Sequence, residues 1–380
     1  MSEEKLVPKL RFSGFDGEWK KLSLIEISKK IGDGMHATPK YVEGSNYYFI
    51  NGNNLDNKNI VINQKTKCVP LEEYEKHKIN LKNTILISIN GTIGNLAYYN
   101  GENVILGKSA AYIILNDNIN KEFIFNYLQI GKIKYYFNSE LTGSTIKNLS
   151  LKTLKNTKIN IPVDNMEINK ISNFLKNIDN KIQLLEEKHV YYQNFKQYLM
   201  QQIFTQKLRF DFNEKWKVYK LKDLLSVKSS NISINKVDNN TGEYPLYGTG
   251  GYLQNIDFYE MEDEYISITK DGSVGKIDYH EGRSSIINTS QYLIPNKNFN
   301  IRFLYYQLQT LNFEKYIVGS SIPHIYFKDY GNEKVKIPNL LEQEIIAKLF
   351  IVIDKKLYML DKSISLMYRF KKGLLQQMFI

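Results

Sequence analysis

The sequence has very few of the residues that build metal sites or disulfides. Cys68 is the single cysteine among 380 residues, which excludes an internal disulfide and any zinc site with several thiolate ligands. The five histidines are not spaced as metal ligands, and the pattern HExxH is absent; they are His36, His77, His189, His280 and His324. We therefore expect no metal centre in this chain.

Long hydrophobic runs are also missing. No stretch approaches the roughly 20 consecutive apolar residues that a membrane-spanning helix needs. The opening segment MSEEKLVPKL carries acidic residues where a secretion signal needs basic ones, and it contains no apolar run. These features predict a cytoplasmic protein without a membrane segment.

The sequence lacks the motifs of enzymes that act on DNA. It contains no Asp-Pro-Pro-Tyr or Asn-Pro-Pro-Phe segment of the kind that amino-methyltransferases use, and no GxGxxG motif. The tripeptide GKS at Gly107–Ser109 is close to the end of a P-loop, but the earlier Gly101 lies one position too far away. We therefore expect a chain with no catalytic residues that binds no cofactor itself.

The chain is basic, with 51 Lys and Arg, 40 Asp and Glu, and a net charge of +11. This charge favours nucleic acid as a partner, although Lys-rich chains are also common where coding DNA is AT-rich. The excess lies in the first half: residues 20–160 hold 19 basic and 11 acidic residues, whereas residues 217–337 hold 14 of each. The first half should contribute more to any salt-dependent attraction of phosphates.

The sequence repeats itself once, with six matches in the same order. They are KLRF at 9–12 and 207–210, a tryptophan some ten residues later (Trp19, Trp216), strand-like segments at 87–94 and 266–275, GSTI at 143–146 and GSSI at 319–322, NTKINIP at 156–162 and NEKVKIP at 332–338, and QQIF at 201–204 and QQMF at 376–379. The offset falls from 198 to 175 residues, so the second copy is shorter in its variable part. Such order indicates a duplicated architecture.

Each copy begins with a mixed region of short strands and one helix. Alternating runs at Ile85–Ile89 and Lys158–Ile161 predict strands, and the stretches 122–136 and 301–316 are typical of a helix. Each copy then continues into a long helix. The predicted fold is α+β, with two similar domains at 1–162 and 207–338 and two long helices at 163–206 and 339–380.

Both long helices have the same start signal. Asp164 and Asn339 are N-cap candidates, and a glutamate follows three residues later, Glu167 or Glu342, as in a capping box. Apolar residues then recur every 3.5 residues on average, with a polar break at Lys196 and Lys371. The seam consists of Ile171, Leu175, Ile178, Ile182, Leu185, His189, Tyr192 and Leu199 in the first helix, and of Ile346, Phe350, Ile353, Leu357, Leu360, Ile364, Met367, Leu374 and Met378 in the second.

An apolar stripe is most often the face that a helix buries on its own domain. Here two matched helices of some 40 residues would each be about 60 Å long at 1.5 Å per residue, longer than a small domain is wide. We therefore predict that they pack against each other as an antiparallel two-helix coiled coil that separates the two domains. The repeat then has a pseudo-two-fold axis across the middle of the helices.

Two similar domains at a fixed separation suit a ligand that repeats along an axis, as DNA does about every 10–10.5 base pairs. Because the two domains differ in sequence, the target would be asymmetric and in two parts. Candidate DNA-binding residues lie in polar, Gly-rich loops, where Asn can read adenine and Lys can reach guanine or phosphate. In the first domain they are Asp33, His36, Thr38, Lys40, Tyr41, Asn51, Asn53, Asn54, Asn90, Thr92, Lys108, Ser109, Ser144, Thr145 and Lys147. In the second they are Tyr247, Thr249, Lys270, Asp271, Ser273, Arg283, Ser284, Asn288, Thr289, Ser320, Ser321 and His324.

These features together resemble the specificity subunits of type I restriction–modification systems over essentially the full chain. The resemblance is carried by PKLRFSGFDGEWKKLSL at the start, by GDGMHATPKY, by YPLYGTGGYLQNIDFY, and by the Ile-Pro plus long-helix segments that close on Gln-Gln-Ile/Met-Phe. It implies two target-recognition domains, each reading one part of a bipartite DNA site.

The resemblance also implies partners. Two copies of a methyltransferase subunit would dock around the helices, and an endonuclease/translocase subunit would join the complex. S-adenosylmethionine, ATP and Mg²⁺ would be bound by those partners. Two alternatives stay open on the residues alone: a coiled-coil scaffold whose end domains bind proteins, and a self-contained nuclease–methyltransferase.

Overall fold

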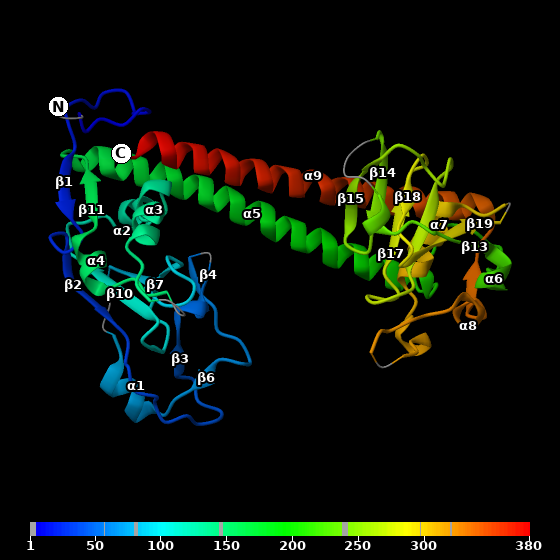
Figure 1. The fold of residues 1–380 in the computed structure, drawn as a ribbon, viewed down its shortest axis with the longest axis horizontal. Coiled ribbons are helices and arrows are strands. Elements are labelled where there is room, and N and C mark those ends of the chain that lie inside the picture. Colours follow the sequence, from blue (N-terminus) through cyan, green and yellow to red (C-terminus); the bar gives the residue numbers. More distant parts are fainter. Residues whose placement is uncertain are drawn as a thin grey trace. The chain divides into compact units, whose positions relative to one another are not determined.

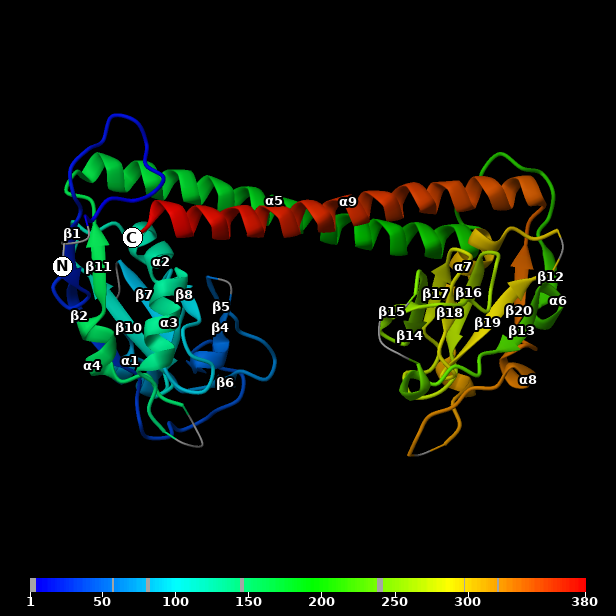
Figure 2. The same cartoon turned by 45° about the horizontal axis from the view of Figure 1, so that its top comes forward.

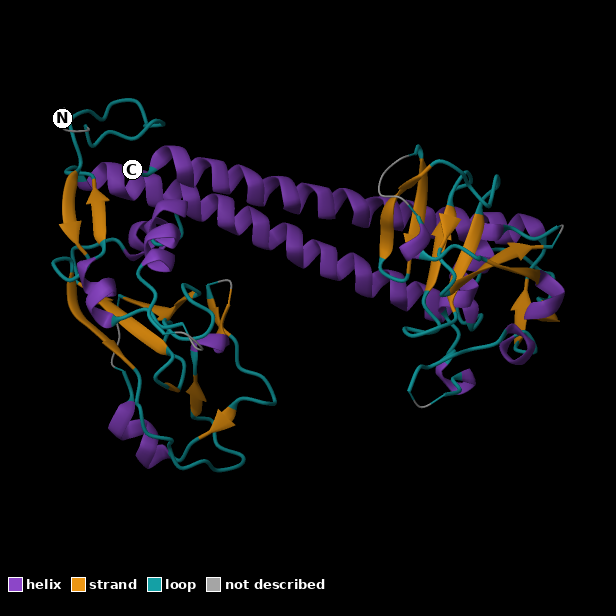
Figure 3. Ribbon diagram, in the orientation of Figure 1, coloured by secondary structure: helices purple, strands orange, loops and turns teal. Residues whose placement is uncertain are grey.

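The chain divides into two compact units. The computed structural model describes residues 5–56, 58–79, 83–143, 147–237, 242–296, 298–319 and 321–380. Unit 1 comprises Met1–Leu185 and Ser363–Ile380, and unit 2 comprises Glu186–Lys362. Both units mix helices and strands, as Figure 3 shows, so the predicted α+β class is confirmed.

A four-stranded antiparallel sheet lies at the centre of unit 1, in the order β2-β10-β7-β8. Strand β7 falls on the run predicted from ILISI, and all five of its residues are buried. Ile85 and Ile87 enter one core cluster and Leu86 enters another, so the strand is covered on both faces. The strands are β2 (Ser28–Asp33), β7 (Thr84–Ser88), β8 (Leu96–Tyr98) and β10 (Ala110–Leu115).

Smaller sheets and short helices complete this domain. The predicted strand KINI is β11 (Lys158–Ile161), which pairs with β1 (Lys20–Ser23). The other sheets are β6 (Lys67–Cys68), β3 (Tyr48–Ile50) and β9 (Val104–Leu106) in that order, and β4 (Leu55–Asp56) with β5 (Asn59–Ile60). The helices are α1 (Leu71–His77), α2 (Lys121–Tyr127), α3 (Gly131–Ser139) and α4 (Leu151–Asn156).

Unit 2 repeats this plan. Its central sheet has the order β13-β19-β16-β17, and helix α7 lies between that sheet and the long helices (Figure 2). The sheet strands are β13 (Leu225–Ser229), β16 (Tyr265–Thr269), β17 (Ile277–His280) and β19 (Ser290–Pro295). The remaining elements are β12 (Lys217–Lys220), α6 (Leu221–Leu224), β14 (Tyr244–Gly248), β15 (Gly251–Ile256), β18 (Ser285–Ile286), α7 (Ile301–Gln309), α8 (Phe327–Tyr330) and β20 (Lys334–Ile337).

The single helix predicted in each domain is wrong in detail, because each stretch is interrupted. In unit 1, Ile130 has an extended backbone between α2 and α3, directly before Gly131, a residue of low helix propensity. In unit 2, the Asn312 side chain accepts the Glu314 N–H and starts a separate short turn at Glu314–Tyr316. The start of α2 and α7 is the same in both units: the side chains of Asn120 and Asn300 cap them.

The two long helices are α5 (Asn165–Phe204) and α9 (Leu340–Met378) (Figure 1). Each begins directly after its predicted N-cap. The Asp164 carboxylate accepts the Met166 N–H, and the Asn339 side chain accepts the Glu342 N–H at 2.9 Å. Each helix passes from one unit into the other, so each unit contains a segment of both.

The glutamate half of the predicted capping boxes is wrong. Glu167 accepts two hydrogen bonds from Arg11, both 2.8 Å, and Glu342 accepts two from Arg209 at 3.0 and 2.9 Å. Both arginines belong to the repeated KLRF motif. The motif therefore supplies a bidentate clamp on the first turn of each long helix, and both glutamates are buried.

The helix segments run antiparallel where ion pairs give their direction. In unit 2, His189 lies 3.0 Å from Asp361, and Lys196 lies 2.7 Å from Asp354. The seam residues do both things that an apolar stripe can do: they pack on their own domain and they pack against the other long helix. In unit 1, Leu175 and Ile182 share one core cluster with both Leu374 of α9 and the residues of their own domain.

The polar breaks in the seam are paired charges. Lys371 lies 2.7 Å from Asp179 in unit 1, and Lys196 lies 2.7 Å from Asp354 in unit 2. The two pairs occupy equivalent positions of the repeat. Lys371 is 7% exposed, and burial lowers the pKa of its ammonium, an effect that nearby Lys58 reinforces.

Candidate DNA interface

Three loops meet at one end of the central sheet in unit 1. The loop after β7 is tied to the segment before β10, because Ile89 N–H donates to the Ser109 carbonyl and the Asn90 side chain donates to the Lys108 carbonyl. Gly91 N–H donates to the Lys147 carbonyl of a third loop. The predicted residues Asn90, Lys108, Ser109 and Lys147 therefore come together, and both lysines are exposed.

The equivalent loops meet in unit 2. Lys270 and Asp271 both donate their N–H groups to the Thr289 carbonyl, at 2.9 and 3.2 Å. His324 returns from the third loop, and its Nδ1 lies 2.6 Å from the Asp271 carboxylate. The predicted residues Lys270, Asp271, Thr289 and His324 are thus neighbours, although up to 54 positions separate them in the sequence.

The two clusters offer different chemistry in the same geometry. Unit 1 offers an amide and two exposed ammonium groups, which suit adenine, guanine edges or phosphates. Unit 2 offers an ammonium beside an imidazole–carboxylate pair, and a carboxylate accepts from the cytosine amino group. Two sites of this kind can read different bases.

A second site in unit 1 gathers the predicted asparagines around a pocket of about 300 Å³. Its lining includes Tyr41 and Asn53, both exposed, along with Asn51 and Asn54. Asn51 accepts the Ser109 hydroxyl, and its own N–H donates to the Asn54 side chain, which in turn donates to the Val61 carbonyl. Asn51 and Asn54 hold the loop in shape, whereas Asn53 is placed for an outside ligand.

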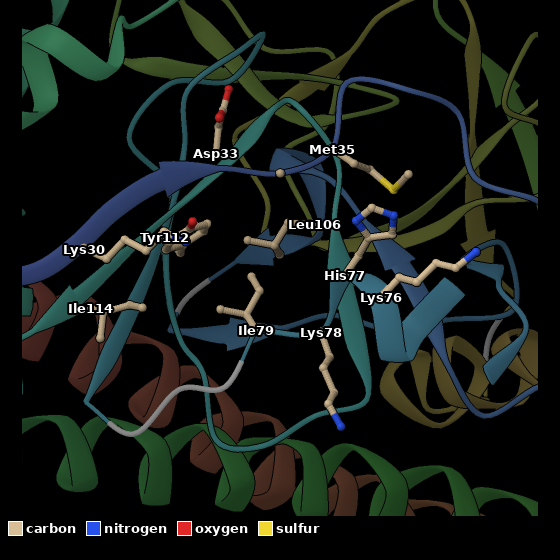
Figure 4. Close-up of a pocket in the computed structure, with 11 residues that line it drawn as sticks. Lys30, Asp33, Met35, Lys76, His77, Lys78, Ile79, Leu106, Tyr112 and Ile114 are labelled. Atoms are coloured by element: carbon tan, nitrogen blue, oxygen red, sulfur yellow. The ribbon is translucent and has the colours of Figure 1, made fainter. Parts of the chain in front are cut away.

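A larger pocket of about 510 Å³ lies beside Asp33 in unit 1. Figure 4 shows the polar and charged residues of its lining, which come from three elements: Lys30 and Asp33 of β2, Lys76 and His77 of α1, and Tyr112 of β10, with Lys78 following α1. Asp33 also lies 2.8 Å from the imidazole of His36. The basic residues Lys30, Lys76 and Lys78 were missed in the sequence, where the run Lys76-His77-Lys78 was the available signal.

Gly34 explains why the chain can bend at this pocket. A Cβ there would lie 2.2 Å from the Leu106 carbonyl oxygen, so only glycine allows β2 to leave the sheet against that backbone. The Met35 N–H then donates to the same carbonyl at 2.8 Å. The GDGMHATPKY loop thus starts from a fixed point of the fold.

Several predicted residues make bonds within the domain. Ser284 is buried and bonds the Tyr265 hydroxyl, Arg283 pairs with Glu262 at 3.1 Å, and the Tyr247 ring packs on His280. The Thr249 carbonyl accepts from Lys276. Other predicted residues are exposed: Thr38, Lys40, Thr92, Ser273, Asn288 and Ser321. Ser144, Thr145 and Ser320 lie outside the described residues.

Across the described residues, no group of three or more His, Cys, Asp or Glu is arranged to hold a metal ion. No helix in the same part of the chain is long and apolar enough to cross a membrane.

Comparisons with known proteins agree with this architecture. Relatives include a protein named as a type I specificity subunit in Mycoplasma genitalium, 24% identical over 78% of this chain and 81% of the relative. Another is the MjaVIII specificity subunit of a type I restriction enzyme from Methanocaldococcus jannaschii, 24% identical over 44% of this chain and 42% of the relative.

Solved structures show the same fold. The crystal structure of a type I restriction–modification S subunit from M. genitalium matches with a TM-score of 0.66 and 21% identity, covering 98% of this chain and 99% of that one. A chain from a structure of complex assembly and conformational transition in a type I R-M system matches with a TM-score of 0.56 and 15% identity, covering 95% and 97%.

The duplicated plan is visible in the family match as well. The family described as "Type I restriction modification DNA specificity domain" matches residues 16–190 and again residues 213–365. These two matches fall on the two halves of the internal repeat and together cover most of the chain. The protein therefore belongs to the type I restriction–modification DNA specificity family, with two copies of the family's domain.

Proposed function

We propose that this chain selects the DNA site of a type I restriction–modification complex and reads an asymmetric target in two parts, one with each unit. The observation that supports this most is the convergence of the same three loops in both units with different side chains at their ends. A duplicated framework with changed reading groups is what two dissimilar half-sites require.

In unit 1 we assign reading and phosphate contacts to Asn53, Asn90, Lys108 and Lys147, with the basic pocket at Lys30 and Lys76 as a further phosphate contact. In unit 2 we assign them to Lys270, Asp271 and His324. The charge of residues 20–160 supports a larger phosphate contribution from unit 1.

The chain would act as a recognition subunit, with the chemistry carried out by its partners. Exposed apolar residues recur at equivalent positions of the two long helices. The equivalent residues are Met166 and Leu341, Leu184 and Met359, Tyr191 and Leu366, and Phe195 and Phe370. Equivalent apolar faces support docking of two copies of one partner, the methyltransferase subunit. S-adenosylmethionine, ATP and Mg²⁺ would be bound by the methyltransferase and endonuclease/translocase subunits.

The test is to map the methylated motif in a host genome by modified-base sequencing. Lys108→Ala with Lys147→Ala should relax or abolish only the part of the motif read by unit 1. Asp271→Asn with His324→Gln should change only the other part. Exchange of residues 20–155 for another domain of this family should replace the first part outright.

Lys152→Ala is the matched control, because Lys152 is an exposed lysine of α4 outside these loops. It should leave the motif intact. A loop variant that alters both parts of the motif, or neither, contradicts the assignment. Binding to DNA without sequence preference, measured by gel shift with competitor, would favour the scaffold alternative.

A further inference from the structure

The helix segments of unit 2 carry an apolar stripe outside their packed seam. On α5 it consists of Tyr191, Phe195 and Tyr198, at the spacing of i, i+4 and i+7. The rings of Tyr191 and Phe195 stack with their planes 5° apart and their centroids 6.1 Å apart. On α9 the stripe continues with Val352 and Met359, seven residues apart.

Both halves of the stripe point to the same side of the helix pair. At 100° per residue, each half lies about 100° from the seam, in the same rotational sense along its own helix. Because the segments run antiparallel, that rotation turns both halves toward one common face. Unit 2 therefore presents one apolar surface with contributions from two helices.

Unit 1 carries a reduced copy of this stripe. Leu366, Phe370 and Leu184 replace Tyr191, Phe195 and Met359, and all three are exposed. The two remaining positions differ: Asn177 stands at the equivalent of Val352, and Gly373 at the equivalent of Tyr198. Val352 is 65% exposed and Tyr198 is 57% exposed, so unit 2 has additional apolar contact area.

We propose that the two copies of the methyltransferase subunit bind with unequal affinity, and that the copy on unit 2 binds first. This inference rests on the proposed function, which supplies the partner. The same partner meets a five-residue stripe on unit 2 and a three-residue stripe on unit 1. Assembly would then pass through a complex with one methyltransferase.

The stripe on unit 2 is large enough to serve as a binding surface for another protein. An aromatic side chain offers on the order of 150–250 Å², so the unit 2 stripe exposes apolar area on the order of 500 Å². That is near the largest patches, roughly 300–600 Å², that monomers leave open. Burying one valine and one tyrosine more should tighten binding about tenfold or more.

The test uses the full chain with the methyltransferase subunit of its own system. Native mass spectrometry of a titration gives the two dissociation constants, and hydrogen exchange at substoichiometric methyltransferase shows which unit is covered. We expect a 1:1 complex in which 186–204 and 340–362 are protected before 165–185 and 363–378. Equal protection of both units, or earlier protection of unit 1, overturns the inference.

Two double variants change the differing positions, one pair in each unit. Val352→Asn with Tyr198→Gln should weaken the first binding step about tenfold and bring the two constants together. Asn177→Val with Gly373→Tyr should strengthen the second step, and a Cβ at Gly373 meets no atom within 4 Å. Variants that leave both constants unchanged also overturn the inference. If no methyltransferase binds even to the unaltered chain, the proposed function fails instead.

Discussion

Unit 1 and unit 2 have the same framework, but the equivalent aspartates of their long helices have different partners. Asp179 of unit 1 pairs with Lys371 of the partner helix and with Lys58 of the recognition domain. Asp354 of unit 2 pairs with Lys196 and accepts the Tyr306 hydroxyl at 2.7 Å. The position of Tyr306 is Asn126 in unit 1, so a loop lysine takes over what a helix tyrosine does in unit 2.

This difference shows which contacts are the same in the two copies of the repeat and which are not. The helix–helix ion pair is kept in both units, whereas its link to the recognition domain changes with the domain. Lys58 lies between β4 and β5 with a positive φ of 75°, a conformation that a lysine rarely adopts without cause. The recognition domain of unit 1 is therefore anchored to its helices through Lys58, which lies between β4 and β5.

The largest expected effect comes from the arginine clamps. Arg11→Ala should leave the buried Glu167 carboxylate without its partner and lower the free energy of unfolding of unit 1 by about 4 kcal/mol. Arg209→Ala should cost less, because Glu342 also accepts a hydrogen bond from the Trp216 indole at 3.1 Å. Hydrogen exchange in peptides of each unit, measured on the full chain, gives the two losses.

Trp216→Phe is the control for this comparison. It removes the additional donor to Glu342, and combined with Arg209→Ala it should make the loss in unit 2 match the loss in unit 1. The indole Nε1 of Trp19, the equivalent residue, is buried without a partner. Equal losses from the two single arginine variants would contradict this account.

The second prediction concerns the paired carboxylates. Asp179→Asn should destabilise unit 1 by about 3 kcal/mol, because Lys371 is buried and loses its counter-charge. Asp354→Asn should cost only about 1 kcal/mol, since the Asp354 side chain is 35% exposed and its partner can reach water. Asp179→Leu combined with Lys371→Leu should recover most of the loss, because an apolar pair needs no counter-charge. Failure of that rescue would mean that Lys371 has a role beyond the ion pair.

The third prediction is that the stability of unit 2 depends on pH through a buried histidine that unit 1 lacks. Burial, with a smaller effect of Lys276, lowers the pKa of His280 to about 4, while Tyr99 stands at the equivalent position of unit 1. The unfolded chain binds the proton at its ordinary pKa of about 6.5, so stability falls as pH drops from there toward 4. Unit 2 should lose about 2 kcal/mol between pH 7 and pH 5 from this residue.

His280→Gln is the matched variant, because glutamine does not titrate and can still bond the Ser267 hydroxyl, which lies 2.8 Å from the imidazole. Its unfolding free energy should be flat over that pH range. Acid loss of the same size in the variant would assign the effect to other groups.

Local patterns predicted the fold where local physics decides it. The caps at Asp164 and Asn339 and the strand at Ile85 follow from neighbours in the sequence. The Arg11–Glu167 clamp does not follow from the sequence, although both residues lie in repeated segments, because 156 positions separate them. For the same reason, the sequence pattern shows Lys196 and Lys371 only as polar breaks in the seam and not as members of ion pairs.

The candidate site also combines features that the local sequence predicts with contacts that it does not. The loops were identified by their Gly and polar residues, but their convergence depends on strand order, which the sequence does not show directly. Ser284 and Asn51 have the composition of reading residues, yet they bond inside the domain. Loop composition alone cannot separate a side chain that faces a ligand from one that holds the loop.

The smallest expected effect comes from a feature that the two units share, the N-caps of α2 and α7. Asn120 and Asn300 cap α2 and α7 in the same way, with their side chains accepting the N–H of Phe123 and Phe303 at 3.1 and 2.9 Å. Asn120→Ala and Asn300→Ala should each cost about 1 kcal/mol, the usual loss for an N-cap. Hydrogen exchange of α2 and α7 measures both, and Asn120→Asp or Asn300→Asp should retain the cap. Equal losses are expected because the two caps belong to the duplicated framework, so a difference well above about 1 kcal/mol would show that even this shared element depends on the domain around it.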